Sequence, residues 1–122
     1  MIEIDYRDKR PIYEQIKEKI KNLIISGAMK EDEKIPSVRE LAGEIAINPN
    51  TIQKAYKELE NENYIYSIRA KGYFVSDVKN INPNNIELLK ENLKEILNEL
   101  YFLGEDYSKI TDIVENIYKG KE

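Results

Sequence analysis

The sequence predicts a mostly α-helical chain with one small β-hairpin, in which a larger N-terminal part precedes a short helical arm. Apolar residues recur at helical spacing along five stretches, most of them bounded by proline, asparagine or glycine. A further stretch, from Tyr64 to Val75, is rich in β-forming residues around a charged turn. At 122 residues the chain has room for one small domain and an appendage, not for two full domains.

The first helix is predicted from Pro11, which suits a first helical position, to a C-cap at Gly27. Its side chains are predicted to form core scaffold, while Tyr13 and Lys17 either pack, are solvated or touch a phosphate. Before it, Ile2 and Ile4 alternate with acidic residues and predict a short edge strand or an ordered arm. The apolar positions of this helix are Ile12, Ile16, Ile20, Leu23 and Ile24.

The segment from Ile35 to Glu62 predicts two short helices joined by a tight turn. Ser37 and Glu40 have the spacing of a capping box at the start of the first helix. Asn48 followed by Pro49 provides an N-cap and a first helical residue for the second. The predicted inner faces are Leu41, Ala42, Ile45 and Ala46 on the first helix, and Ile52, Ala55, Tyr56 and Leu59 on the second.

The outer face of the second helix carries Asn50, Thr51, Gln53, Lys54 and Lys57. A short helix with amides, a hydroxyl and lysines on its first exposed turns has the chemistry to read bases in a DNA major groove. The alternative is an ordinary solvated helix face.

Arg39 lies on the first turn of the preceding helix and is predicted to project near the start of the second. A guanidinium there can clamp a phosphate or bind the O6 and N7 atoms of guanine. The alternative is an ion pair with a nearby carboxylate such as Glu40 or Glu44.

The hairpin is predicted from Tyr64–Ile68 and Tyr73–Val75, with Asn63 in a left-handed cap before it. Arg69 and Lys71 at its tip are placed to enter a minor groove or to pair with phosphates; the alternative is that both are solvated.

Residues 77–85 are polar and asparagine-rich and predict a linker between a domain at 1–76 and a helical domain at 86–122. Two short helices with so much leucine and isoleucine make a poor core alone, so a second copy of the chain is predicted to cover them. The alternative is that the apolar stripe folds back on the N-terminal domain. The predicted dimerisation residues are Leu89, Leu93, Ile96, Leu97, Leu100, Leu103, Ile113 and Ile117.

Charge and composition exclude several classes of protein. The formal net charge is −4, but residues 1–76 carry 13 Lys and Arg against 13 Asp and Glu, so the acidic excess lies in the tail. The chain has neither histidine nor cysteine, which excludes His- or Cys-based catalysis and zinc sites, and no cofactor is expected. No apolar run approaches the ~20 residues of a membrane span, so we expect a cytoplasmic protein without membrane contact.

Four motifs at matching mutual spacing resemble the GntR family of bacterial winged-helix transcription regulators. They are Pro11–Ile16, Lys34–Ala42, Asn48–Tyr56 and Gly72–Val75. The short helical tail resembles the YtrA subfamily, whose second domain is only a dimerisation unit. Alanine at position 70 and asparagine at position 63 stand where relatives usually have glycine.

The resemblance implies a winged helix-turn-helix that binds an inverted-repeat operator in double-stranded DNA as a homodimer, most simply as a repressor of an ABC-transporter operon. A winged-helix protein-interaction module is the alternative. For a small effector bound where the two parts meet, the residues give no cluster. The predicted DNA-binding residues are Ser37, Arg39, Asn48, Asn50, Thr51, Gln53, Lys54, Lys57, Arg69, Lys71 and Gly72.

Overall fold

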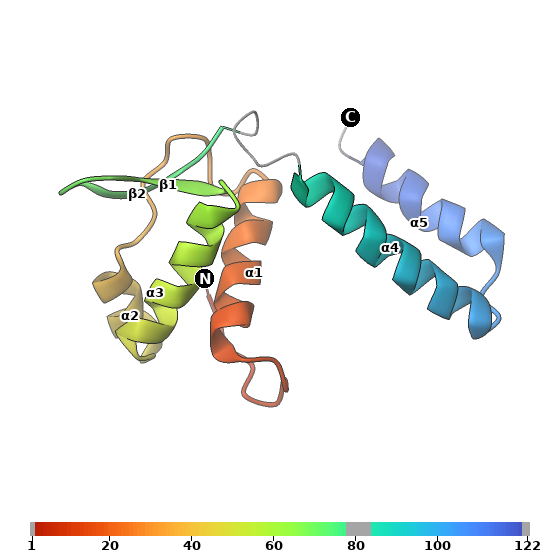
Figure 1. Cartoon of the computed structure of the whole chain (residues 1–122), viewed down its shortest axis with the longest axis horizontal. Helices are drawn as coiled ribbons and strands as arrows, with labels where there is room; N and C mark the ends of the chain where they lie inside the picture. Colours follow the sequence, from red (N-terminus) through yellow and green to blue (C-terminus); the bar gives the residue numbers. More distant parts are fainter. Residues whose placement is uncertain (1, 78–83, 121–122) are drawn as a thin grey trace. The chain divides into compact units, whose positions relative to one another are not determined.

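The computed structural model describes residues 2–77 and 84–120, and the chain divides into two compact units, Met1–Asn82 and Pro83–Glu122. The mostly α-helical fold with one hairpin is confirmed (Figure 1). The N-terminal unit contains α1 (Ile12–Ile25), α2 (Val38–Ile45), α3 (Pro49–Asn61), β1 (Ile65–Ile68) and β2 (Gly72–Val75), and the C-terminal unit contains α4 (Asn84–Phe102) and α5 (Tyr107–Lys119).

Helix α1 is the scaffold against which α3 packs. Pro11, predicted as the first helical residue, is instead the N-cap, so the helix begins one position later, and Gly27 follows its end with φ +83°. Ile16 and Ile20 are fully buried, as their helical spacing predicted. Lys17 lies on the same helix and forms ion pairs with Glu58 of α3 and with Glu62 just after it. Lys17 therefore joins the two helices.

The N-terminal arm is ordered by a side chain, not by a neighbouring strand. Gln15 of α1 is buried, and its Nε2 donates to the backbone oxygen of Asp5 at 3.1 Å. Its Oε1 accepts from the backbone N–H of Asp5 at 3.0 Å. The Gln15 carboxamide thus bonds both the backbone N–H and the backbone oxygen of Asp5. Ile2 and Ile4 of the same arm pack against the core. Of the two predicted alternatives, the structure shows the ordered arm.

The hairpin β1–β2 is antiparallel, with Ile65 opposite Val75. The charged connector before α2 runs along the edge of β2 that does not face β1 and forms backbone hydrogen bonds with it. Asp32 donates its backbone N–H to Val75 at 2.8 Å, Val75 donates to Glu33 at 2.9 Å, and Ile35 donates to Tyr73 at 3.0 Å. The hairpin is therefore fixed to the segment that leads into α2, which the sequence pattern did not predict.

Tyr56 of α3 lies at the centre of the N-terminal core. Its ring is fully buried and meets the Tyr73 ring of β2 edge-on, with centroids 5.2 Å apart. Its hydroxyl donates to the backbone oxygen of Pro36 at 2.7 Å, just before α2. One side chain thus connects α3, the start of α2 and β2. The buried core residues are Ile16, Ile20, Met29, Ile35, Leu41, Ala42, Ile52, Ala55, Tyr56, Leu59, Tyr64, Ile65 and Val75.

The C-terminal unit is a helical pair whose turn contains Gly104 at φ +86°. Helix α4 begins at Asn84, inside the range predicted as linker; residues 78–83 of that range lie outside the described residues. Along 2–77 and 84–120, every helix is too short or too polar to cross a lipid bilayer.

Replacing Tyr56 with phenylalanine is expected to lower the free energy of unfolding by about 1–2 kcal/mol, because the Pro36 carbonyl loses its partner inside the fold. Urea titration followed by circular dichroism measures this change. Tyr6→Phe is the control, since the Tyr6 ring is 71% exposed and should leave the midpoint unchanged. Equal midpoints for wild type and Tyr56→Phe would contradict the prediction.

The same hydroxyl predicts a pH dependence. Burial, reinforced by Glu40 and Glu44, raises the pKa of Tyr56 above its ordinary value of 10. The unfolded chain loses this proton first as the pH rises, so the free energy of unfolding falls above pH 10, by up to about 1.4 kcal/mol per pH unit from this group. Urea midpoints measured from pH 8 to 11 should decline less steeply in Tyr56→Phe. Parallel declines in the two proteins would contradict this assignment.

Candidate nucleic-acid interface

Side-chain caps fix the starts of α2 and α3, the two helices on either side of a tight turn. The Ser37 hydroxyl accepts from the backbone N–H of Glu40 at 3.0 Å, as the capping box predicted. The Asn48 Oδ1 atom accepts from the N–H of Asn50 at 2.8 Å. Between them Ala46 ends α2 in the left-handed region at φ +55°. Ser37 and Asn48, both predicted to bind DNA, therefore fix the start of each helix.

The inner face of α3 packs in the core, so the outer face of this helix, which is polar, is exposed to solvent. Asn50, Gln53, Lys54 and Lys57 are exposed, and Thr51 is half-buried. The inner residues Ile52, Ala55, Tyr56 and Leu59 are all buried. The helical period thus separates the two faces as predicted, and the structure brings the five outer residues onto one surface.

Two outer residues of α3 contact aromatic rings from other elements. The Lys54 Nζ atom lies 4.0 Å from the centre of the Tyr13 ring on α1, a cation–π contact. The Gln53 Nε2 atom donates to the Tyr73 hydroxyl of β2 at 3.1 Å. For Tyr13 the sequence predicted packing, solvation or phosphate contact, and it predicted no role at the site for Tyr73. No local pattern marks either pair, because each partner lies far away in the sequence.

The other predicted DNA-contacting cations are Arg39, Lys57, Arg69 and Lys71. All four are exposed, and within residues 2–77 and 84–120 none of them forms an ion pair. The alternative of an Arg39 pair with Glu40 or Glu44 is therefore not what the described residues show. A cation without a carboxylate partner can meet a phosphate without first breaking an internal pair. By contrast, burial opposes the charged form of Lys17, but the hydrogen bonds that Lys17 donates to Glu62 and Glu58 raise its pKa.

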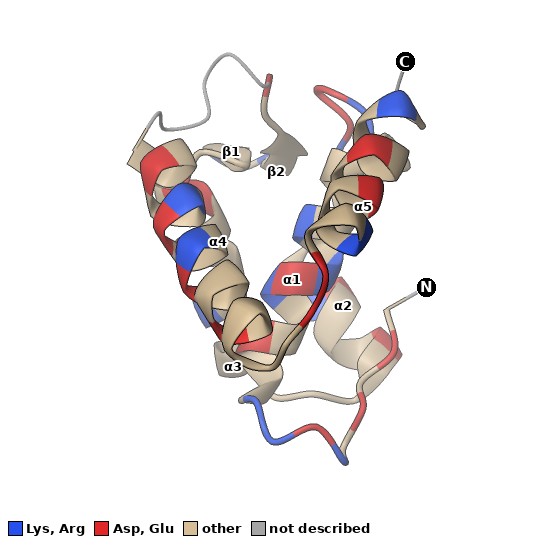
Figure 2. Cartoon of the chain, turned by 90° about the vertical axis from the view of Figure 1, so that its right-hand side faces the viewer, with Lys and Arg blue, Asp and Glu red and all other residues tan. Residues whose placement is uncertain are grey.

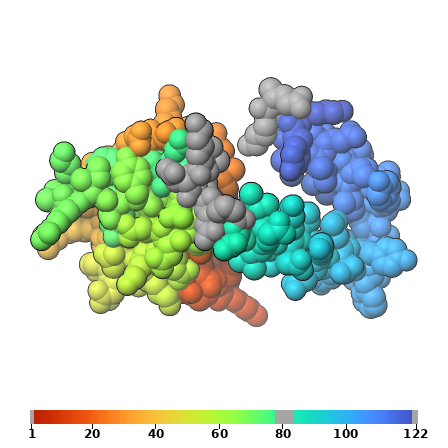
Figure 3. All heavy atoms as spheres, turned by 45° about the horizontal axis from the view of Figure 1, so that its top comes forward, coloured from red at the N-terminus to blue at the C-terminus, as the bar shows by residue number. Residues whose placement is uncertain are grey.

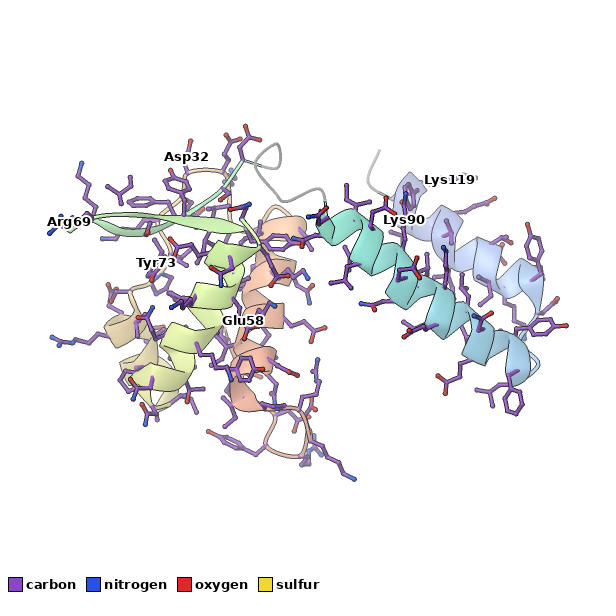
Figure 4. The ribbon with its side chains drawn as sticks, in the orientation of Figure 1. Asp32, Glu58, Arg69, Tyr73, Lys90 and Lys119 are labelled. Atoms are coloured by element: carbon purple, nitrogen blue, oxygen red, sulfur yellow. The ribbon has the colours of Figure 1, made fainter. Side chains whose placement is uncertain are left out.

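The hairpin projects from the N-terminal unit and ends in a three-residue loop (Figure 3). Lys71 donates its backbone N–H to Ile68 at 3.0 Å, and Ala70 takes φ +68° between them. Gly72 follows at φ +118°, and a Cβ there would lie 3.2 Å from the Lys34 side chain. Gly72 is thus favoured by its positive φ, which would strain a residue with a side chain, while Arg69 stands at the loop tip (Figure 4).

The C-terminal unit has no buried residue in either helix. Its charged residues alternate in sign from Glu87 to Glu95 of α4, where Glu87 pairs with Lys90 and Glu91 with Lys94 (Figure 2). The predicted dimerisation residues Leu97 and Leu100 are half-buried and line a hollow of about 760 Å³ beside Tyr107 and Ile110. The other six are 49–71% exposed, namely Leu89, Leu93, Ile96, Leu103, Ile113 and Ile117.

A capped helix-turn-helix with an exposed polar second helix, beside a hairpin that ends in two cations, defines a winged-helix DNA-binding domain. Comparisons agree with this class. A family model described as bacterial regulatory proteins of the gntR family matches residues 12–75. The HTH-type transcriptional repressor YtrA of Bacillus subtilis (strain 168) is 40% identical over 119 residues, which are 96% of this chain and 92% of that protein.

Solved structures extend the similarity to the whole chain. A transcriptional antiterminator from Listeria monocytogenes EGD-e superposes with a TM-score of 0.87 at 37% identity, covering 97% of this chain and 90% of that one. The DNA-binding domain of AraR, in complex with operator ORE1, superposes with a TM-score of 0.54 at 32% identity over 62% of this chain and 93% of that one. The chain belongs to the GntR family, and its similarity to YtrA confirms the predicted subfamily. It is a DNA-binding transcription regulator and not an enzyme.

Replacing Ala46 with glycine is expected to raise the free energy of unfolding by about 0.5–1 kcal/mol. Ala46 has a left-handed backbone, which costs a residue with a Cβ about 1–2 kcal/mol, and glycine removes this strain. Glycine also gives the unfolded chain more conformational freedom, which cancels part of this stabilisation. Thermal unfolding measures the shift. Ala28→Gly is the matched control, because Ala28 is exposed and lacks a positive φ, so it should lower stability slightly. A decrease for Ala46→Gly as large as that of the control would contradict the account.

Proposed function

We propose that this protein is a homodimeric repressor that binds an inverted-repeat operator in double-stranded DNA. The observation that carries the proposal is the outer face of α3, which is polar and exposed on a helix whose opposite face is fully buried. Polar residues on such an exposed face are available for base edges. Operator complexes of the AraR domain support DNA as the partner. Binding in the cytoplasm, to chromosomal DNA, follows from this role.

In this proposal Asn50, Thr51, Gln53 and Lys54 read base edges in the major groove. Lys54 can move from the Tyr13 ring to a base or phosphate at small cost, because an exposed cation–π contact is worth only about 0.5–1 kcal/mol.

Contacts to the DNA backbone fix the register of the complex. Arg39 and Lys57 flank the base-reading residues and bind phosphates, and the backbone at the start of α3 adds a further contact. Arg69 and Lys71 reach the adjacent backbone or minor groove from the hairpin.

The second copy is supplied through α4 and α5. Full burial of a leucine or isoleucine side chain stabilises a fold or a complex by about 1.5–3 kcal/mol. Because these side chains are roughly half exposed, about half of that stabilisation remains available for binding a partner. The apolar positions Ile86, Leu89, Leu93, Ile96, Leu100 and Leu103 alternate by threes and fours, the spacing of a helix–helix seam. A two-fold pair then holds two α3 helices over successive major grooves.

The target of the proposed repressor follows from the subfamily resemblance. On that ground we infer an operon that encodes an ABC transporter. Binding to the upstream region of the gene itself and of adjacent transporter genes is the first place to look for an operator.

Arg39→Ala and Lys54→Ala are each expected to weaken operator binding about tenfold or more in a gel-shift titration, since a base or bidentate phosphate contact contributes about 1–3 kcal/mol. The matched control is Arg7→Ala, because Arg7 is 95% exposed and paired with Asp5, outside the proposed interface. If both variants bind as tightly as the wild type, the assignment of these two residues to the interface is wrong.

Ile96→Glu is expected to convert the dimer into a monomer, because it places a carboxylate in the apolar seam of α4. Sedimentation at micromolar concentration measures the mass. Asn98→Glu adds the same charge on the polar side of α4 and should leave the dimer intact. A wild-type chain that sediments as a monomer would overturn the dimer, and so would an Ile96→Glu variant that stays dimeric.

A further inference from the structure

One exposed side chain of the interface is held by the hairpin. Gln53 lies on the outer face of α3, where long polar side chains usually sample several rotamers. Its Nε2 atom nevertheless donates to the Tyr73 hydroxyl of β2, at 3.1 Å. The hydroxyl reaches across from the hairpin to the base-reading helix, and Figure 4 shows Tyr73 between the two elements.

Tyr73 is itself held from two sides. Its ring rests against the edge of Tyr56, at 5.2 Å and 81°, and Tyr56 is fixed by full burial and by its own bond to Pro36. Its backbone oxygen accepts from the N–H of Ile35 at 3.0 Å. The hydroxyl therefore stands on a rigid base, and a hydrogen bond to it restricts the Gln53 carboxamide.

A restricted carboxamide has a defined hydrogen-bonding pattern. One N–H is used by Tyr73, so in this orientation the Gln53 oxygen and its second N–H remain free. Those two groups match the N6–H₂ donor and N7 acceptor of adenine in the major groove. Because the side chain is already ordered, binding costs less conformational entropy than it would for a free glutamine.

We propose that Tyr73 is a positioning residue that sets the base preference of Gln53 and directs it toward adenine. This inference rests on the proposed function and adds to it a residue of the hairpin that touches no base. The hairpin then contributes to specificity through its strand β2 as well as to affinity through its tip.

Tyr73→Phe tests the proposal, because it removes the hydroxyl and keeps the ring against Tyr56. The purified full-length chain is used to select sequences from a library with a randomised half-site. We expect the preference at one base pair to fall about two- to tenfold, the size of one hydrogen bond. This should be the same pair that Gln53→Ala relaxes, and the double variant should lose no more than Gln53→Ala alone.

Tyr66→Phe is the matched control. Tyr66 lies on β1 of the same hairpin, and its hydroxyl donates to Asp32 in the connector before α2, at 2.7 Å, not to a residue of α3. It should keep the wild-type preference at every position, and all variants should unfold near the wild-type temperature because the bonds removed are exposed.

Two results for Tyr73→Phe overturn the inference. The first is an unchanged base preference, and the second is an equal loss of affinity for all sequences, which would indicate a general role in hairpin stability. Retained preference in Gln53→Ala would also overturn it, since no base would then depend on Gln53. A wild-type chain that selects no sequence would instead overturn the proposed function, and this inference with it.

Discussion

The burial of Tyr56 is the constraint on which the N-terminal unit depends. Its ring occupies the centre of the core, its hydroxyl binds the carbonyl before α2, and its edge supports Tyr73 on β2. Because the phenol must point inward, the residues a half-turn away on α3 must point outward. The polar face that we assign to DNA is thus a geometric consequence of the buried face of the same helix. The contact between Tyr56 and Tyr73 also fixes the hairpin against α3.

Much of this unit was predictable from local chemistry. A capping serine, an Asn–Pro helix start and a left-handed asparagine at position 63 each act within a few residues, and each was found where the pattern placed it. Contacts between distant residues were not predictable: Gln15 on the arm, Tyr13 under Lys54, and Tyr73 against Gln53. Such pairs leave no periodic signal, because the side chains involved satisfy each other only after the fold has brought them together.

The C-terminal unit differs from the N-terminal unit because its helices do not form a buried core. Its apolar residues repeat with helical spacing, yet neither helix has a buried residue, since two short helices cannot cover each other. The sequence therefore predicted the helices and their unfilled face together. We propose that a second copy of the chain covers this surface, because a two-fold pair is also the arrangement in which a helix-turn-helix reaches two half-sites. The exposed apolar surface of the tail and the proposed binding to two half-sites would both be satisfied by a two-fold pair.

The most direct measurement is a hydroxyl-radical footprint of the wild-type chain on the DNA upstream of its own gene. We predict two protected segments related by a two-fold axis, with centres about 10 base pairs or a small multiple apart. Each should lie over one arm of an inverted repeat. A single protected segment without a symmetric partner, at protein concentrations that saturate binding, would contradict the account of paired recognition helices.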